Sequence, residues 1–205
     1  MVLSLQGCMA VGKTTAVKYL QEHAPYVNIS YEINSDVLDD IKRRKLNKNI
    51  YEDYLEIQRL WLNKEIIRYN KAEKFPCSIM DFGAEEIEFY TLHYPSTIGQ
   101  NWEIETALHK ELEAVRNCMP ARILFLDASD EVLIKHKMAD KTRSREFFEH
   151  HLKYFLPLKR KWFLKKDNVD ILHVDNLSAV EVGEKVKKWV DSCIQNRLPA
   201  ASHTR

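Results

Sequence analysis

A glycine-rich stretch near the amino terminus has the residue types and the spacing that bind phosphate groups. The pattern G-x-x-x-x-G-K-[ST] is matched by Gly7, Cys8, Met9, Ala10, Val11, Gly12, Lys13 and Thr14, with Thr15 directly after. The glycines let the backbone bring its N–H groups close to phosphate oxygens, and a following helix directs its positive end at the same anion. We expect Lys13 to bind the β- and γ-phosphates and the Thr14 hydroxyl to bind Mg²⁺. This stretch, the P-loop (residues 7–15), therefore predicts binding of ATP and Mg²⁺.

Three acidic residues lie at the ends of apolar stretches that are typical of strands: Glu32, Asp81 and Asp127. A carboxylate at such a strand end can accept a proton from a hydroxyl group or help to bind a metal ion. Simpler interpretations stay open, because Glu32 could be an acid in solvent and Asp81 could cap the next helix. For Asp127 we favour a helix-capping acid over a Walker-B metal ligand.

Two arginines in a polar segment could complete a phosphate site. Residues 139–146 include Arg143 and Arg145, and an aromatic-bearing helix is expected directly after them. Guanidinium groups are always charged and bind oxygen atoms in pairs, which suits the charge that develops on a transferred phosphoryl group. A solvated basic loop is the simpler alternative. The basic run 159–161 in the following helix is interpreted as a solvated face.

Strands and helices alternate along the chain five times. We expect strands at 2–5, 26–33, 77–81, 123–127 and 169–174, the first directly before the P-loop. This order favours a phosphate-binding loop over a chance glycine-rich turn, and it predicts a three-layer α/β fold with a five-stranded parallel sheet and helices on both faces. Ligands then bind beyond the carboxyl ends of the strands. We expect one domain over 1–195 and a flexible C-terminal tail over 196–205.

Turn and capping signals place several helix ends. A helix is expected over about 51–73, opened by a capping box of Asn49 and Glu52, and another over about 84–93, ended by a loop at 94–99. Ser178 and Glu181 form a second capping box, before the final helix. A further amphipathic helix is expected from Ile104 to Val115 by the spacing of its apolar residues.

Composition is that of a globular protein, with 205 residues, 45% hydrophobic and 30% charged residues and a net charge of +1. The balanced charge gives no sign of a nucleic-acid or membrane surface, and no apolar run is long enough to span a membrane. Four scattered cysteines without a C-x-x-C pair indicate reduced thiols. We therefore expect a cytoplasmic protein, and a first strand that begins at residue 2 leaves no room for a signal peptide.

These features together resemble the P-loop small-molecule kinases, most closely the deoxynucleoside kinase and thymidylate kinase group, over about residues 1–190. The resemblance implies that Glu32 lies near the acceptor hydroxyl, that Asp81 helps to hold Mg²⁺, and that Arg143 and Arg145 belong to a mobile lid. The chain departs from the group at Phe82, where an arginine that handles the acceptor is usual. This departure favours an uncharged acceptor.

Recognition of an acceptor base is suggested by an amide and several aromatic side chains. Gln58 lies in the long helix where a nucleoside kinase uses an amide to read a base, and Tyr54 could stack on that base, as could aromatic residues at 61, 89 and 90. Aromatic residues at helical spacing are more often part of the core. Substrate-binding candidates are therefore Tyr54, Gln58 and Phe82.

The sequence predicts an ATP-dependent phosphotransferase that moves the γ-phosphate to a hydroxyl of a small acceptor, with a nucleoside or nucleotide favoured. A non-nucleoside metabolite or an antibiotic is the alternative acceptor. A GTPase reads guanine with an N-K-x-D motif, and it is disfavoured because the nearest match, residues 70–73, lies in a helical pattern. An ATPase module is disfavoured because Ala128, and not a glutamate, follows Asp127. The donor base and the oligomeric state stay open, a homodimer included.

Overall fold

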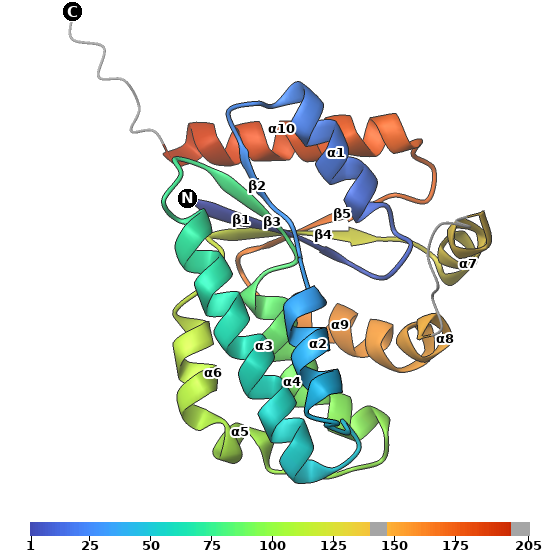
Figure 1. Cartoon of the computed structure of the whole chain (residues 1–205). Helices are drawn as coiled ribbons and strands as arrows, with labels where there is room; N and C mark the ends of the chain where they lie inside the picture. Colours follow the sequence, from blue (N-terminus) through green and yellow to red (C-terminus); the bar gives the residue numbers. More distant parts are fainter. Residues whose placement is uncertain (140–146, 198–205) are drawn as a thin grey trace, which may run out of the picture.

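Five parallel strands form the central layer of the molecule (Figure 1). The computed structural model describes residues 1–139 and 147–197. The strands lie in the order β2-β3-β1-β4-β5. Their bounds are β1 Val2–Gly7, β2 Asn28–Ser30, β3 Ser78–Asp81, β4 Arg122–Asp127 and β5 Val169–His173. The predicted five-stranded parallel sheet is therefore confirmed, although β2 is shorter than expected and ends before Glu32.

Helices cover both faces of this sheet (Figure 1). Helices α1 and α10 pack together on one face, and α3, α4 and α6 contact one another on the other, with α9 against α4. The helical bounds are α1 Lys13–His23, α2 Ser35–Arg43, α3 Tyr51–Ala72, α4 Ala84–Thr97, α5 Ile104–Ala107, α6 His109–Arg116, α7 Asp130–Ala139, α8 Phe148–His150, a π-helical turn η1 His151–Phe155, α9 Leu156–Phe163 and α10 Ala179–Arg197. The three-layer prediction is confirmed.

The two faces of β1 are packed differently. Side chains alternate along a strand, so Leu3 and Leu5 join the hydrophobic core that includes α1 and α10. Ser4 and Gln6 point to the other face and are also buried, and both donate hydrogen bonds to Glu85 Oε1 at the start of α4. Burial in these surroundings raises the pKa of the Glu85 carboxyl. The strand that leads into the P-loop is therefore apolar on one face and hydrogen-bonded on the other.

Several predicted helix ends are wrong, because tertiary contacts override local signals. Helix α4 continues through Pro95 to Thr97 where a loop was expected, and its Tyr94 hydroxyl donates to Asn49 Oδ1. Asn49 is thereby occupied, and α3 begins after Ile50 without a side-chain cap, so the first capping box does not form. The second one does, since Ser178 and Glu181 exchange hydrogen bonds.

Two further helical predictions need correction. The helix expected from Ile104 to Val115 is two short helices, α5 and α6, which meet at Leu108. The segment after the lid is helical as expected but contains the π-helical turn η1, and such turns often occur at functional sites. The spacing of apolar residues indicates a helix but not the breaks or changes of hydrogen-bond pattern within it.

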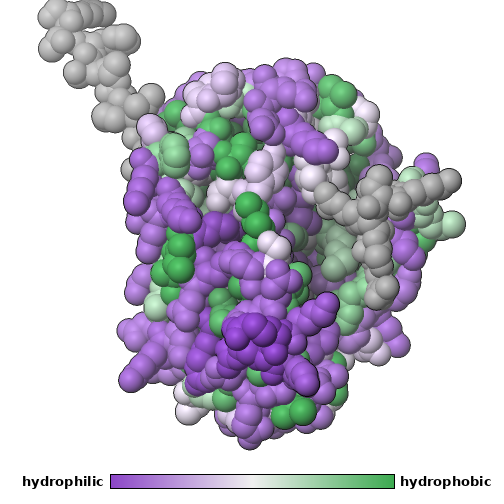
Figure 2. Space-filling view, in the orientation of Figure 1, coloured by the Kyte–Doolittle hydropathy of each residue, from purple (hydrophilic) through white to green (hydrophobic). Residues whose placement is uncertain are grey.

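The described surface agrees with the composition. Hydrophilic side chains cover most of the face shown in Figure 2, interrupted by small separate hydrophobic areas. The four cysteines are free thiols, as expected. None of the helices in the described part combines the length and the hydrophobicity that crossing a membrane requires.

Candidate active site

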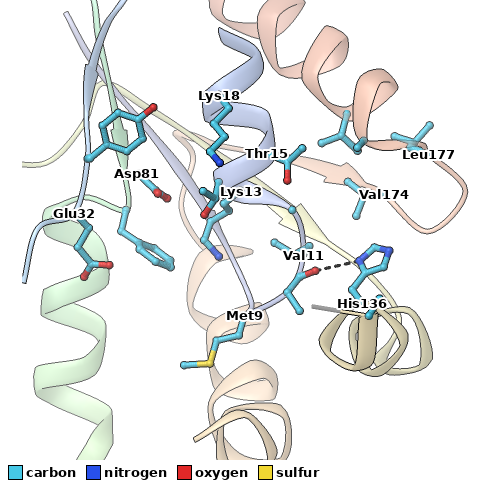
Figure 3. A pocket seen from close by; sticks show the side chains of 18 residues that line it. Met9, Val11, Lys13, Thr15, Lys18, Glu32, Asp81, His136, Val174 and Leu177 are labelled. Carbon is cyan, nitrogen blue, oxygen red and sulfur yellow. Dashed lines mark hydrogen bonds between the residues drawn. The ribbon is translucent and has the colours of Figure 1, made fainter. Parts of the chain in front are cut away.

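The P-loop turns where its glycines allow positive φ angles. Gly7 has φ 141°, and a Cβ at this position would lie 2.5 Å from the carbonyl oxygen of Leu126. Gly12 has φ 105° and open space where a Cβ would stand. Ala10 adopts φ 67°, and its carbonyl oxygen is hydrogen-bonded to His136 Nδ1 at 3.0 Å (Figure 3). These features leave a concave turn of backbone in front of α1, which is the form that binds phosphate.

Lys13 lies inside this turn with its ammonium group among backbone oxygens. It is 7% exposed and donates to the carbonyl oxygens of Gly7 at 2.9 Å and Cys8 at 2.8 Å. Burial, and next the nearby Lys159 ammonium, lower the pKa of Lys13 to about 8. Two of the three N–H donors of this ammonium group are therefore used within the loop.

A cleft of about 840 Å³ opens above the P-loop at the carboxyl ends of the strands. Figure 3 shows Glu32 and Asp81 on one side of Lys13, and His136, Val174 and Leu177 on the other. The second side is formed by α7, the segment that follows β5 and the start of α10. The structure therefore brings the P-loop, Glu32 and Asp81 to one cavity, as the strand-end argument predicts.

The cleft residues fit ATP and Mg²⁺. The Gly12 turn leaves the room that a phosphate oxygen needs, and Lys13 supplies a positive charge beside it. Magnesium usually keeps several water ligands and takes the others from one or two protein oxygens and from phosphates. Thr14 and Asp81 both line the cleft and would be those protein ligands. Within the described ranges, three or more acidic, histidine or cysteine side chains nowhere gather as a metal cage.

The segment after β3 is held by an arginine that the sequence analysis missed. Arg68 of α3 donates to the carbonyl oxygens of Ser30, Asp81 and Phe82, at 3.0, 3.3 and 2.7 Å. It also forms a two-pronged ion pair with Glu65, and both side chains are largely buried. Arg68 thus fixes the ends of β2 and β3 relative to each other, and with them Asp81 and Phe82.

Tyr54 belongs to the core and not to a substrate-binding surface. Its side chain is 1% exposed, and its ring packs against Tyr94 and Trp102. Its hydroxyl donates to the carbonyl oxygen of Thr91 at 2.9 Å. A ring that is packed on all sides cannot stack on a base, so the prediction for Tyr54 is wrong.

Gln58 is also mostly buried, one turn further along α3. It is 8% exposed, and its Oε1 accepts a hydrogen bond from the Thr91 hydroxyl at 2.8 Å. This half of the amide is therefore occupied by the protein. Recognition of a base by Gln58 stays a prediction. Phe82 lines the cleft, and its role in substrate binding also stays a prediction.

Asp127 is paired with a basic side chain and does not cap the following helix, so the favoured interpretation of a helix-capping acid is wrong. Its Oδ1 accepts a hydrogen bond from Arg160 Nε at 3.0 Å, and Ser129, not Asp127, caps α7. The expectation of a solvated basic run at 159–161 is wrong for two of its three members, because Arg160 is half-buried in this pair and Lys159 is 1% exposed. Long-range ion pairs of this kind leave no local sequence signal.

The remaining predictions for this site concern the lid. Arg143 and Arg145 lie outside the described residues, as does most of the segment 139–146. Their role stays a prediction.

Comparison with solved structures identifies the fold. A structure of deoxyadenosine kinase from M. mycoides with products dCMP and a flexible dCDP bound superposes with a TM-score of 0.68 and 14% identity, over 94% of this chain and 100% of that chain. The fold is that of P-loop nucleoside and nucleotide kinases. The same kinase with bound dCTP gives a TM-score of 0.65 at equal identity and coverage. Thymidylate kinase from Candida albicans gives 0.63 and 14% identity, over 94% of this chain and 91% of that chain.

Sequence comparison adds nothing to this picture, since no family model and no curated protein matches the chain. At 14% identity the structural likeness establishes the fold and not the substrate. The resemblance inferred from the P-loop and the order of elements is confirmed at that level.

Proposed function

We propose that this protein is an ATP-dependent phosphotransferase that moves the γ-phosphate to a hydroxyl group of a small acceptor, with a nucleoside or nucleotide favoured. The observation that carries the proposal is the shared cleft, in which the P-loop, Glu32 and Asp81 face one another. Kinases of nucleosides and nucleotides with the same fold support it.

Each residue has a role that its position supports. The P-loop amides and Lys13 bind and neutralise the phosphates, and Thr14 and Asp81 hold Mg²⁺, which neutralises further charge when bound. Glu32 is exposed in the cleft and accepts the proton of the acceptor hydroxyl, or orients that hydroxyl. Arg143 and Arg145 add positive charge at the transferred group.

The two ends of the cleft suit the two substrates. Val174, Leu177 and Val182 provide an apolar wall beside the P-loop, where the base of the donor nucleotide packs. On the opposite side, Glu32 and Phe82 face the acceptor. In this proposal the donor therefore lies over α1, and the acceptor lies over the ends of β2 and β3.

An ATPase or GTPase module is the second candidate, and the structure gives it little support. The nearest N-K-x-D match begins inside α3, and Asp127 is paired with Arg160. A non-nucleoside metabolite or an antibiotic is an alternative acceptor for the same reaction.

Incubation with radiolabelled ATP and Mg²⁺, alone and with pooled nucleosides, nucleoside monophosphates and aminoglycosides, tests the proposal. We expect transfer to one pool and little hydrolysis without an acceptor. Steady hydrolysis that no acceptor changes would instead identify an ATPase.

A further inference from the structure

A buried lysine behind the cleft is used by none of the roles above. Lys159 of α9 is 1% exposed and forms an ion pair with Glu86 of α4, Nζ to Oε1, at 2.5 Å. Both residues come from helices on the face of the sheet opposite α1 and α10 (Figure 1). Burial raises the pKa of the Glu86 carboxyl, whereas the Lys159 ammonium opposes that rise.

The hydrogen bonds of this pair are incomplete. An ammonium group has three N–H donors, and within the described residues the structure gives Lys159 one acceptor, Glu86 Oε1. Glu86 Oε2 is buried and has no partner in the same part of the chain. Buried charges that lack hydrogen bonds are costly, and replacing such a pair by apolar residues often stabilises a protein. An incomplete pair therefore contributes little to stability, and its unused N–H groups make it a candidate for binding a ligand.

Three aromatic rings lie close to the Lys159 ammonium group. Lys159 Nζ lies 5.0 Å from the centroid of Tyr90, 5.3 Å from that of Phe82 and 5.7 Å from that of Phe89. Aromatic rings attract an ammonium group through their π-electrons. An anion binds the same group more strongly, through charge-assisted hydrogen bonds.

Phe82 lines the cleft and lies next to Lys159. Lys13 Nζ lies 4.3 Å from the centroid of the same ring, so the two ammonium groups share it. Each lysine is within electrostatic reach of the other, since Lys159 contributes to the lowered pKa of Lys13. Phe82 also adopts φ 59°, a left-handed conformation that costs a bulky residue roughly 1–2 kcal/mol. A strained residue that lines a cleft is a good candidate for one that moves.

We propose that Lys159 is a second cation of the phosphate-transfer site, covered by Phe82 in this structure and brought into contact with the transferred phosphoryl group when that ring turns aside. Glu86 tethers the ammonium through one oxygen and leaves its other N–H groups for the phosphoryl oxygens. The inference rests on the proposed function and adds a catalytic residue to it.

The chemical step needs such a charge. The acceptor oxygen forms a bond to the γ-phosphorus, the bond between that phosphorus and the β–γ bridging oxygen breaks, and the electron pair stays on ADP. The hydroxyl proton passes to Glu32. Lys159 takes no proton and donates hydrogen bonds to the equatorial oxygens of the transferred group, where charge is spread in the transition state.

The decisive variant removes the pair without leaving a buried charge: Glu86→Gln with Lys159→Met. The first measurement is the rate of transfer in a single turnover. The second is the affinity for ADP with Mg²⁺, measured by calorimetry with and without aluminium fluoride. Aluminium fluoride mimics the transferred group. We expect ADP alone to bind within about threefold of the parent. The transfer rate and the gain in affinity from aluminium fluoride should both fall about 100-fold, the loss that accompanies removal of one transition-state donor.

Two controls match this variant. Glu88→Gln with Arg116→Met removes an ion pair from the same helix α4, on the side that faces α6. Lys161→Met removes an exposed positive charge from the same helix α9. Both should keep the parent's rate and its response to aluminium fluoride. If Glu86→Gln with Lys159→Met also keeps them, Lys159 is structural and the inference is overturned.

A second variant keeps the test valid if the pair variant does not fold. In Phe82→Ala, Lys159 should react with an acylating reagent, as read by mass spectrometry, and ADP with Mg²⁺ and aluminium fluoride should protect it where ADP with Mg²⁺ does not. No reaction, or no difference in protection, contradicts the inference.

The two proposals fail separately. If the parent phosphorylates an acceptor and the pair variant does so equally fast, the proposed function stands and the role of Lys159 falls. If no acceptor is phosphorylated but the aluminium fluoride response still depends on Lys159, the proposed function falls and the contact of Lys159 with the γ-phosphate position stands.

Discussion

The side of the cleft that we propose for the phosphates and the side that we propose for the acceptor are built from different kinds of contact. On the phosphate side, the P-loop and the start of α1 place the glycine turn, Lys13 and Thr14 within residues 7–15. On the acceptor side, Arg68 joins the ends of β2 and β3 from α3, and Glu86 meets Lys159 across 73 positions of sequence. One side is a local turn and the other is an assembly of helices.

This difference separates the invariant part of the reaction from the part that selects a substrate. A polyphosphate presents the same oxygens in every reaction, so a short loop with fixed backbone geometry is sufficient to bind it. An acceptor differs from one kinase to another, and its site is formed by side chains that tertiary packing brings together. We therefore expect changes on the phosphate side to affect chemistry, and changes on the acceptor side to affect stability as well.

Lys13→Ala gives the largest expected effect and tests the phosphate side. The rate of transfer should fall by at least about 10³-fold, because a buried cation beside the phosphates is lost. The free energy of unfolding should change little, since Lys13 is bonded to carbonyls of its own loop. Urea denaturation and single-turnover kinetics measure the two quantities, with Lys188→Ala on α10 as an exposed control. Unchanged turnover would end the argument for the P-loop.

Arg68→Met tests the acceptor side by its stability. The variant leaves the buried Glu65 carboxylate without its ion-pair partner and frees three carbonyl groups. The free energy of unfolding should fall by about 3 kcal/mol, the usual cost of breaking a buried pair. Lys71→Met, an exposed change in the same helix, should cost far less. Equal losses in the two variants would show that the acceptor side is not held by Arg68.

Arg143→Ala and Arg145→Ala test whether the lid segment belongs to the chemistry. Each should lower the rate of transfer about 100-fold, because a charged donor to the transferred group is removed. Thermal unfolding should not change by more than it does in Arg43→Ala, an exposed arginine of α2. A loss of stability as large as the loss of rate would make these arginines structural.

The lowered pKa of Lys13 predicts a pH profile for the phosphate side. Lys13 must be protonated to bind phosphate, and its pKa is about 8. The ratio kcat/KM for ATP, which reports on the enzyme before ATP binds, should therefore fall about tenfold per pH unit above pH 8. Stability has the opposite sign, because the unfolded chain binds the extra proton between about pH 8 and 10.5, so this group makes the fold more stable as pH rises through that range.

A profile of kcat/KM that stays flat to pH 10 would contradict the buried position of the ammonium. Measurement at several pH values with saturating acceptor isolates the effect on ATP. A parallel profile of kcat should stay flat to higher pH, since bound phosphate raises the pKa of Lys13.

Tyr54→Phe has the smallest expected effect and tests whether Tyr54 belongs to the core or to the acceptor site. Loss of the hydroxyl removes a buried hydrogen bond to Thr91, which should cost about 1 kcal/mol in chemical denaturation. The KM for the acceptor should stay within twofold of the parent. A large rise in KM without loss of stability would return Tyr54 to the acceptor site.

Local sequence determined the phosphate side. The P-loop pattern, the strand before it and the helix after it depend on residues that are close in the chain, so their geometry could be predicted, as could the alternation that gives a parallel sheet. The positions of Glu32 and Asp81 followed from topology, because the carboxyl ends of parallel strands share one edge of the sheet.

The tertiary structure alone decided which polar residues are buried and which partners they take. Lys159 was expected in solvent but lies in the interior with Glu86. Tyr54 was expected to bind a ligand but lies in the core. No sequence pattern indicated that Arg68 joins the ends of two strands. Periodicity tells which residues share a face of a helix, but the chemistry of that face depends on what other elements bring to it. Contacts across 73 positions of sequence are set by helix packing, and no local pattern encodes them.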